Sequence, residues 1–171
     1  MHRLLRPVWD EPRPPDVPAR TWRDWALAAI FVPAAVIEGV VRPDLPWRTL
    51  SVIIAVGLVP TLLWRRSRPL LMVAIAFGTC ALVSIPTGGA PELNALVFML
   101  ALGYALVRWG SGRQIVLGAA IIVGKIGLSA ALGHLSLGDV AAGFVVLTSV
   151  GALGTAFRYR ARSRRRELDQ V

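Results

Sequence analysis

The fold is decided by a stretch that carries no charged side chain, Thr49–Trp64, which reads TLSVIIAVGLVPTLLW. A buried helix of a soluble protein still shows a polar face to its surroundings, and this stretch shows no charge on any face. A helix that crosses the hydrocarbon of a bilayer needs about 17–25 mostly apolar residues. The stretch therefore favours lipid, rather than water, as its solvent.

Five more apolar runs flank this stretch, and short linkers rich in Pro, Gly or Arg separate them. The runs are Trp25–Val41, Leu70–Ile85, Leu93–Val107, Gln114–Leu132 and Val140–Phe157. Linkers this short make neighbouring helices antiparallel. We therefore expect an all-α integral membrane protein with about six transmembrane helices, in which Pro33 and Pro60 each bend a helix.

The composition of the 171 residues agrees with a membrane protein. Hydrophobic residues make up 55% and charged residues 17%, whereas a soluble domain carries about 25% charged residues. Cys80 is the only cysteine, so a disulfide within the chain and a CxxC motif are excluded. We expect Cys80 to be a small buried residue and His134 to be a polar loop residue, with no metal site and no cofactor in this chain.

The arginines are distributed unevenly between the two sides of the predicted membrane. Sixteen of them fall on the side of the N-terminus and only Arg42 and Arg48 fall on the other. Because cytoplasmic loops carry the excess of basic residues, this distribution predicts that both termini lie in the cytoplasm, and we expect the membrane to be the plasma membrane. It also accounts for the net charge of +9 without a nucleic-acid partner. The sixteen are Arg3, Arg6, Arg13, Arg20, Arg23, Arg65, Arg66, Arg68, Arg108, Arg113, Arg158, Arg160, Arg162, Arg164, Arg165 and Arg166.

Three segments follow from these patterns. Residues 1–21 are rich in Pro and Arg and lack an apolar core, so we expect a disordered cytoplasmic tail and not a signal peptide. Residues 22–157 form the predicted six-helix transmembrane domain, and residues 158–171 form a basic cytoplasmic linker helix. Five tryptophans lie at predicted helix ends, where amphipathic rings anchor a protein at the headgroup level. These are Trp22, Trp25, Trp47, Trp64 and Trp109.

Two charged residues lie inside the predicted membrane, Glu38 and Lys125. Counting residues from the cytoplasmic ends of their helices places both at depths of about 17–20 Å. An unpaired charge at such a depth costs at least about 2.5–3.5 kcal/mol, so one interpretation is an intramembrane polar pair that acts as a switchable lock or a ligand contact. The alternative is that Glu38 reaches the outer headgroups while Lys125 extends to an interface or pairs structurally.

The C-terminal segment continues the last apolar run without a Pro or a Gly. Apolar residues recur there at intervals of four and three, which is the spacing of a heptad seam with one arginine in it. The seam is Phe157, Ala161, Arg164, Leu168 and Val171. We expect the last helix to run into the cytoplasm and begin a coiled coil that transfers a signal; the alternative is a basic tail that frays.

Several of these motifs resemble one family. They are Trp22-Arg-Asp-Trp25 at the first helix, Glu38-Gly39 near its outer end, Trp64-Arg-Arg-Ser-Arg-Pro69, and the exit Arg162-Ser-Arg-Arg-Arg-Glu-Leu168. Their order is similar to that in the N-terminal membrane sensor region of actinobacterial two-component histidine kinases that pair with LuxR/NarL-type response regulators. The resemblance implies a homodimer, a kinase domain in cis or trans that binds ATP and Mg²⁺, and a response regulator downstream. No phosphoacceptor His and no ATP-binding motif is present, so we expect a sensor module that lacks its kinase domains.

Two other function classes stay open at this stage. A small multipass carrier or channel would line a path with Glu38 and Lys125, and a membrane scaffold would only bind partner helices. Neither class, nor the sensor hypothesis, supplies catalytic residues in this chain, so enzymatic activity would come only from the kinase that the resemblance implies. No pattern in the sequence identifies a binding site for the stimulus. Because the predicted outer loops are short, we expect sensing within or at the membrane.

Overall fold

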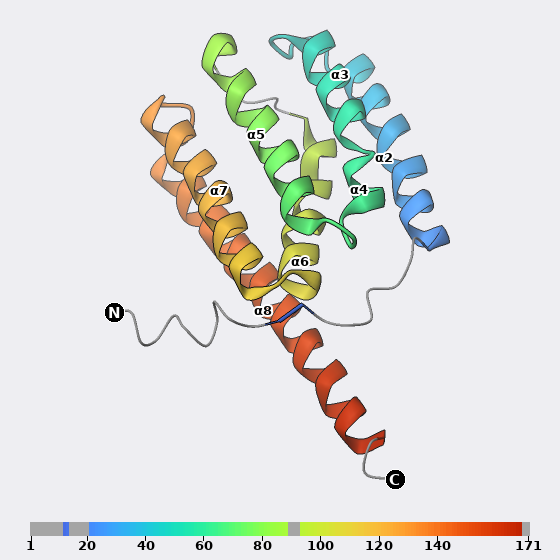
Figure 1. The fold of residues 1–171 in the computed structure, drawn as a ribbon. Helices are drawn as coiled ribbons and strands as arrows, with labels where there is room; N and C mark the ends of the chain where they lie inside the picture. The colour runs from blue at the N-terminus through green and yellow to red at the C-terminus, as the bar shows by residue number, and fades with distance from the viewer. Residues whose placement is uncertain (1–11, 14–20, 89–92, 169–171) are drawn as a thin grey trace.

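The computed structural model of the chain describes residues 12–13, 21–88 and 93–168. Within these residues the regular structure is entirely helical (Figure 1). The elements are α2 (Trp22–Val41), α3 (Arg48–Leu58), α4 (Thr61–Trp64), α5 (Pro69–Thr87), the 3-10 helix η1 (Asn94–Phe98), α6 (Met99–Trp109), α7 (Gly112–Ala131) and α8 (Leu137–Leu168).

Every predicted apolar run forms a helix or a pair of consecutive helices. Within the described residues, four helices, α2, α5, α7 and α8, have the length and apolar composition needed to cross a membrane. The other two runs form the shorter apolar helices Arg48–Trp64 and Asn94–Trp109. The prediction of an all-α protein is therefore confirmed, four of the helices have the length and composition of membrane-spanning segments, and six crossings remain a prediction.

The two prolines inside apolar runs have different outcomes. Pro60 lies between α3 and α4, as expected of a residue that lacks the N–H needed to continue a helix and clashes with the preceding turn. Pro33 lies within α2, which continues through it as one helix of 20 residues. Pro60 therefore interrupts its apolar run, whereas Pro33 does not.

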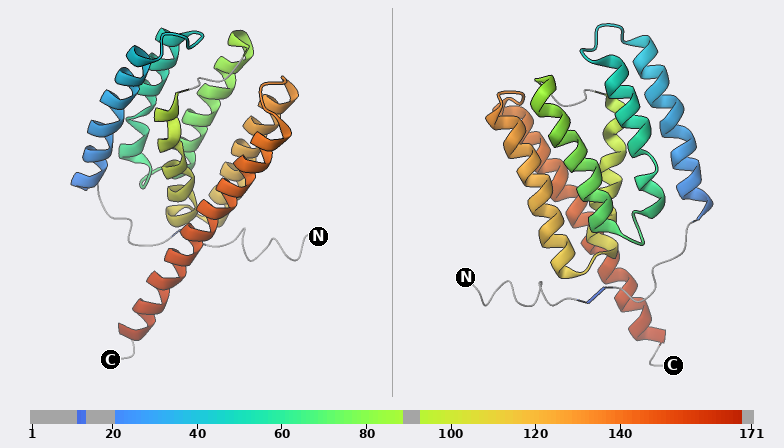
Figure 2. Two further views of the ribbon diagram at one scale, coloured as in Figure 1. Left: turned by 180° about the vertical axis from the view of Figure 1, so that it is seen from behind. Right: turned by 45° about the horizontal axis from the view of Figure 1, so that its top comes forward.

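The helices form one bundle, in which α2 and α7 lie toward opposite sides with α5 and α6 between them (Figures 1 and 2). α5 packs mainly against α7, α6 against α8, and α2 against α3. The C-terminal part of α8 projects past the other helices at the end of the bundle where α6 ends and α7 begins (Figure 1). The bundle thus leaves one helix extending far beyond its neighbours.

A contiguous apolar core joins the middle helices. Buried side chains from α3, α4, α5, α6 and α7 contact one another there, and the Phe31 ring of α2 packs at 5.5 Å from the Phe98 ring of η1. Cys80 of α5 is buried in this core, as predicted for a small apolar residue. The larger core residues are Ile54, Leu58, Val59, Leu62, Met72, Val73, Phe98, Leu102, Leu106 and Ile122.

Parts of the predicted terminal segments lie outside the described residues. This holds for residues 1–11 and 14–20 of the predicted disordered tail and for residues 169–171. Within the tail, the Arg13 guanidinium donates hydrogen bonds to the backbone carbonyls of Arg66 at 2.7 Å and Ser67 at 2.6 Å. At the other terminus, α8 continues unbroken from Leu137 to Leu168, so the expected continuation of the last helix into the basic segment is confirmed.

The predicted anchor tryptophans lie at helix ends. Trp22, Trp25, Trp47 and Trp64 are exposed, and Trp109 is half-buried. Large exposed indoles are unfavourable in water but suit the headgroup level of a bilayer. Their exposure agrees with the predicted anchoring role.

Candidate functional site

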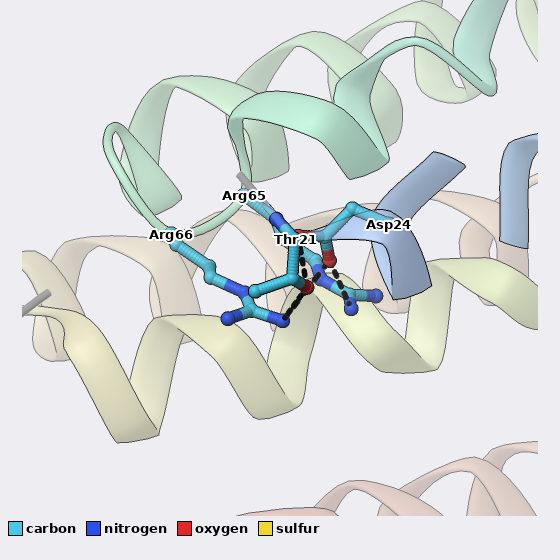
Figure 3. A network of polar contacts seen from close by, with 4 residues as sticks. All are labelled: Thr21, Asp24, Arg65 and Arg66. Atoms are coloured by element: carbon cyan, nitrogen blue, oxygen red, sulfur yellow. Dashed lines mark hydrogen bonds and ion pairs between the residues drawn. The ribbon is translucent and has the colours of Figure 1, made fainter. Parts of the chain in front are cut away.

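A cluster of four polar residues joins the start of α2 to the turn between α4 and α5; we call it the Asp24 cluster (Figure 3). It consists of Thr21, Asp24, Arg65 and Arg66. The Asp24 Oδ1 atom accepts hydrogen bonds from Arg65 at 2.8 Å and Arg66 at 3.1 Å. Its Oδ2 atom accepts from the backbone N–H of Thr21 at 3.0 Å and from the Thr21 hydroxyl at 3.1 Å. Each carboxylate oxygen of Asp24 therefore accepts two hydrogen bonds.

Local sequence explains why Asp24 points into this cluster. Thr21 is the N-cap of α2 and Asp24 is the third helical residue, the arrangement in which a carboxylate reaches back to the N-cap backbone. Only 1% of Asp24 is exposed, and burial of a carboxylate requires compensating charge. Burial lowers the pKa of the Arg65 guanidinium, and the negative charge of Asp24 offsets part of this change. Because arginine titrates far above neutral pH, the ion pair of Arg65 and Asp24 persists at neutral pH.

A second polar cluster lies at the other end of α2; we call it the Glu38 cluster. The Glu38 Oε1 atom accepts from the backbone N–H of Asn94 at 2.8 Å and from Asn94 Nδ2 at 2.9 Å, and Oε2 accepts from the backbone N–H of Ala95 at 2.9 Å. Arg42, one turn further along α2, donates to Oε1 at 3.2 Å. The carboxylate thus binds the first two N–H groups of η1, which the helix itself leaves unpaired.

Gly39, next to Glu38, allows α2 to approach α3 closely. Gly39 is buried, and a Cβ atom at this position would overlap the side chain of Val52 in α3. A larger residue would force the Val52 side chain or the two helix backbones to shift at the level of the Glu38 cluster. The Glu38-Gly39 motif therefore holds α2 against two neighbours, η1 through the carboxylate and α3 through the glycine.

The predicted pair of Glu38 and Lys125 is not the arrangement that the structure holds. Glu38 binds Arg42 and η1, and the ion pairs among the described residues do not include Lys125. Lys125 lies half-buried in α7, and α7 lies on the far side of α5 and α6 from α2 (Figures 1 and 2). Two residues at the same depth of a bundle can still be separated by intervening helices, so matching depths do not bring Glu38 and Lys125 together.

The contact between α6 and α8 is the third candidate region. Gly154 of α8 is buried, and a Cβ there would come within 2.9 Å of the Val107 side chain in α6. One turn further along α8, the Phe157 ring meets the Tyr104 ring edge-on, with centroids 6.4 Å apart. The Arg108 guanidinium lies 5.6 Å from the Phe157 centroid and 5.0 Å from that of Trp109. α6 therefore holds α8 where the apolar part of α8 ends.

The predicted signal-transfer seam begins at this contact. Phe157 is its first residue, and the backbone positions of Ala161, Arg164 and Leu168 continue in α8. Side chains beyond Arg160, and all of Val171, lie outside the described residues. The seam thus stays a prediction beyond Phe157, although the helix that would carry it is present through Leu168.

The remaining candidates lie away from these three regions. Among the described residues no group of three or more His, Cys, Asp or Glu side chains could hold a metal ion. His134 lies half-buried in the turn between α7 and α8. Its backbone N–H donates to the carbonyl of Ser129 at 3.0 Å. This placement is that of a turn residue, as expected from the sequence.

Comparisons with protein-family models, curated proteins and solved structures yield no match for this chain. The functional argument therefore rests on the geometry described above.

The two carboxylate clusters were missed from the sequence, although signals for both exist. Thr21 and Asp24 stand three residues apart at a helix start, a capping-box spacing, and the basic turn with Arg65 and Arg66 was predicted on the same side of the membrane. The predicted helix beginning at Leu93 likewise starts on the side where Glu38 lies. Matching acids to loops and helix starts on the same side would have favoured both contacts.

Proposed function

We propose that this chain is a membrane-embedded input and dimerisation module, of the kind found in two-component sensor histidine kinases. In this proposal six apolar segments cross the plasma membrane, both termini are cytoplasmic, and α8 passes conformational changes to a cytoplasmic kinase domain in cis or trans. The observation that carries the proposal is α8 itself, a single helix of 32 residues. At about 1.5 Å per residue it is about 48 Å long, well beyond the roughly 30 Å of bilayer hydrocarbon.

The composition of α8 supports this role. Residues 138–157 are apolar enough to span a membrane, and the following part of the helix contains Arg158, Arg160, Arg162, Arg164, Arg165 and Arg166. A helix that changes from apolar to strongly basic without a break is a stiff connection from the membrane interior to the cytoplasm. A flexible linker would not transmit a rotation or a shift.

A mechanical connection also runs across the bundle toward α8. Glu38 binds the start of η1, and η1 continues directly into α6. α6 in turn contacts α8 at Gly154 and Phe157. In our proposal, a change near the Glu38 cluster shifts η1 and α6, and the α6 shift rotates or slides α8.

The remainder of α8 favours dimerisation. Its apolar side chains away from α6, among them Val145 and Leu153, are exposed, and only 6% of the residues in its apolar span are buried. The small exposed residue Ala152 would let a second helix approach closely. We propose that a second copy of the chain packs on this face and brings two kinase domains together.

The carrier or channel alternative gains no specific observation. It requires Glu38 and Lys125 along one path, and the Glu38 carboxylate instead binds backbone groups of η1. The scaffold alternative differs from our proposal only in lacking output through α8, and the experiment below distinguishes them.

The output role is tested by joining the chain through Val171 to the dimerisation and ATP-binding domains of a kinase of this class, in vesicles. Arg108→Gln removes the cation beside Phe157, and we expect autophosphorylation to change about two- to fivefold, since a cation–π contact contributes about 0.5–1 kcal/mol. Arg48→Gln makes the same charge change at the start of α3 and should leave the rate unaltered. Equal rates for both variants and the unmodified fusion would support a scaffold instead.

The proposed topology is tested separately with reporter domains. Fusions after Val171 and within residues 65–69 should be cytoplasmic, and fusions within residues 87–91 should be external. A cytoplasmic reporter within 87–91 would show that fewer than six segments cross the membrane.

A further inference from the structure

A groove opens between the first turns of α5 and α7, with a volume of about 840 Å³. Its rim is polar and is formed by Arg13, Ser67, Arg68 and Gln114. Its walls are apolar, with Leu70, Leu71 and Ala74 from α5 and Leu117, Ala120 and Ile121 from α7. The volume lies within the range of about 300–1,000 Å³ that is usual for small-molecule sites.

Polarity changes along the groove in a defined direction. α5 begins at Pro69 and α7 at Gly112, at the same end of the bundle (Figure 1), so Arg68 and Gln114 lie at the helix starts. Ala74 and Ile121 lie nearly two turns further in than Arg68 and Gln114, about 9–10.5 Å deeper at 1.5 Å per residue. A charged group at the rim and a hydrocarbon chain along the walls would both find matching surroundings.

The rim carries positive charge that the described residues do not compensate. Arg68 is exposed, and the described residues that line the groove include no carboxylate. Among the described residues, the ion pairs involve Arg42, Arg65 and Arg66 but neither Arg13 nor Arg68. The two hydrogen bonds of Arg13 go to backbone carbonyls, which orient the guanidinium without cancelling its charge. By contrast, Arg65 and Arg66 at the neighbouring cluster share the carboxylate of Asp24.

We propose that this groove binds one anionic phospholipid from the adjacent leaflet. Its phosphate lies at Arg13 and Arg68, and one acyl chain lies along the apolar walls formed by α5 and α7. Basic pockets between transmembrane helices are suited to anionic headgroups. A soluble phosphate would leave the apolar walls unused, and a zwitterionic lipid would not compensate the rim charge. The proposal goes beyond the proposed input function and does not depend on a kinase.

The test titrates the purified full chain with phosphatidylglycerol and counts bound lipids by native mass spectrometry. Phosphatidylcholine with the same acyl chains and glycerol 3-phosphate serve as comparison ligands. We expect one phosphatidylglycerol per chain, with much weaker binding of the other two. Arg68→Gln should weaken binding about fivefold, the effect of one basic residue at a membrane surface. Arg23→Gln removes an exposed arginine from the first turn of α2 and should leave binding unchanged.

A second pair of variants tests the apolar part of the groove. Ala120→Phe fills it without changing charge and should abolish retention, whereas Ala131→Phe, at another exposed alanine of α7, should not. Circular dichroism checks that each variant folds; if Ala120→Phe does not, the arginine pair decides alone.

Three results would overturn the proposal. Equal retention of phosphatidylcholine would remove the role of charge, and equal losses for Arg68→Gln and Arg23→Gln would indicate general attraction to a basic surface. Displacement of phosphatidylglycerol by glycerol 3-phosphate at similar concentration would identify a site for soluble phosphates rather than for a lipid.

Discussion

α2 and α8 both contain an apolar span of 20 residues, yet the bundle holds them by different means. α2 is fixed at both ends by carboxylates, Asp24 on Arg65 and Arg66 and Glu38 on the start of η1. α8 rests on α6 through Gly154 and the Phe157 ring. The hydrogen bonds of its described side chains stay within the helix and the preceding turn.

We expect this difference to make α2 a static element and α8 a movable one. Charge-assisted hydrogen bonds are short and directional, so they define both the position and the rotation of α2. Packed apolar faces permit small sliding movements of one helix along another. We therefore expect α2 to keep its position and α8 to shift. The following predictions test both parts of this comparison.

The largest effect is expected at Asp24. Asp24→Ala leaves two partly buried guanidinium groups without their counter-ion and should lower the free energy of unfolding by about 3–5 kcal/mol. Asp44→Ala, at an exposed aspartate after α2, should change it by less than about 0.5 kcal/mol. Unfolding in mixed detergent micelles measures both. Similar stabilities of the two variants would show that the Asp24 cluster does not fix α2.

A smaller effect is expected at Glu38. Glu38→Gln keeps one acceptor oxygen but removes the charge beside the η1 N-terminus, for an expected loss of about 1–2 kcal/mol. Because Glu38 and Lys125 have different surroundings, the loss in Glu38→Gln/Lys125→Met should equal the sum of the single losses within about 0.5 kcal/mol. A double variant that is clearly milder than this sum would restore the direct pair expected from the sequence.

The third effect concerns the packing contact between α8 and α6. Gly154→Ala places a methyl group against Val107, and such overpacking costs about 1–3 kcal/mol. At Gly151 a Cβ meets nothing within 4 Å, so Gly151→Ala should be neutral or stabilising by up to about 1 kcal/mol through helix propensity. The same unfolding assay compares them. A destabilised Gly151→Ala with a neutral Gly154→Ala would place the α8 contact on the opposite face.

The helices could be predicted from the sequence, but the contacts between them could not. Uncharged runs and breakers such as Pro60 are local signals, and each predicted run is helical. Depth along a helix is also readable, but the order of helices around the bundle is not, and Glu38 was therefore matched with Lys125 instead of η1. The Asp24 contact spans 41 residues to Arg65, and only the shared side of the membrane connects the two in the sequence.

The most direct test of the output role of α8 changes the phase of its C-terminal part without replacing any of its residues. One residue inserted after Tyr159 rotates everything downstream by about 100°, and seven residues nearly restore the original direction. With the chain joined to kinase domains in vesicles, autophosphorylation should invert or vanish for the one-residue insertion and recover for the seven-residue insertion. Equal autophosphorylation at every insertion length would contradict the account, because it would make the segment after Phe157 a flexible tether instead of an output helix.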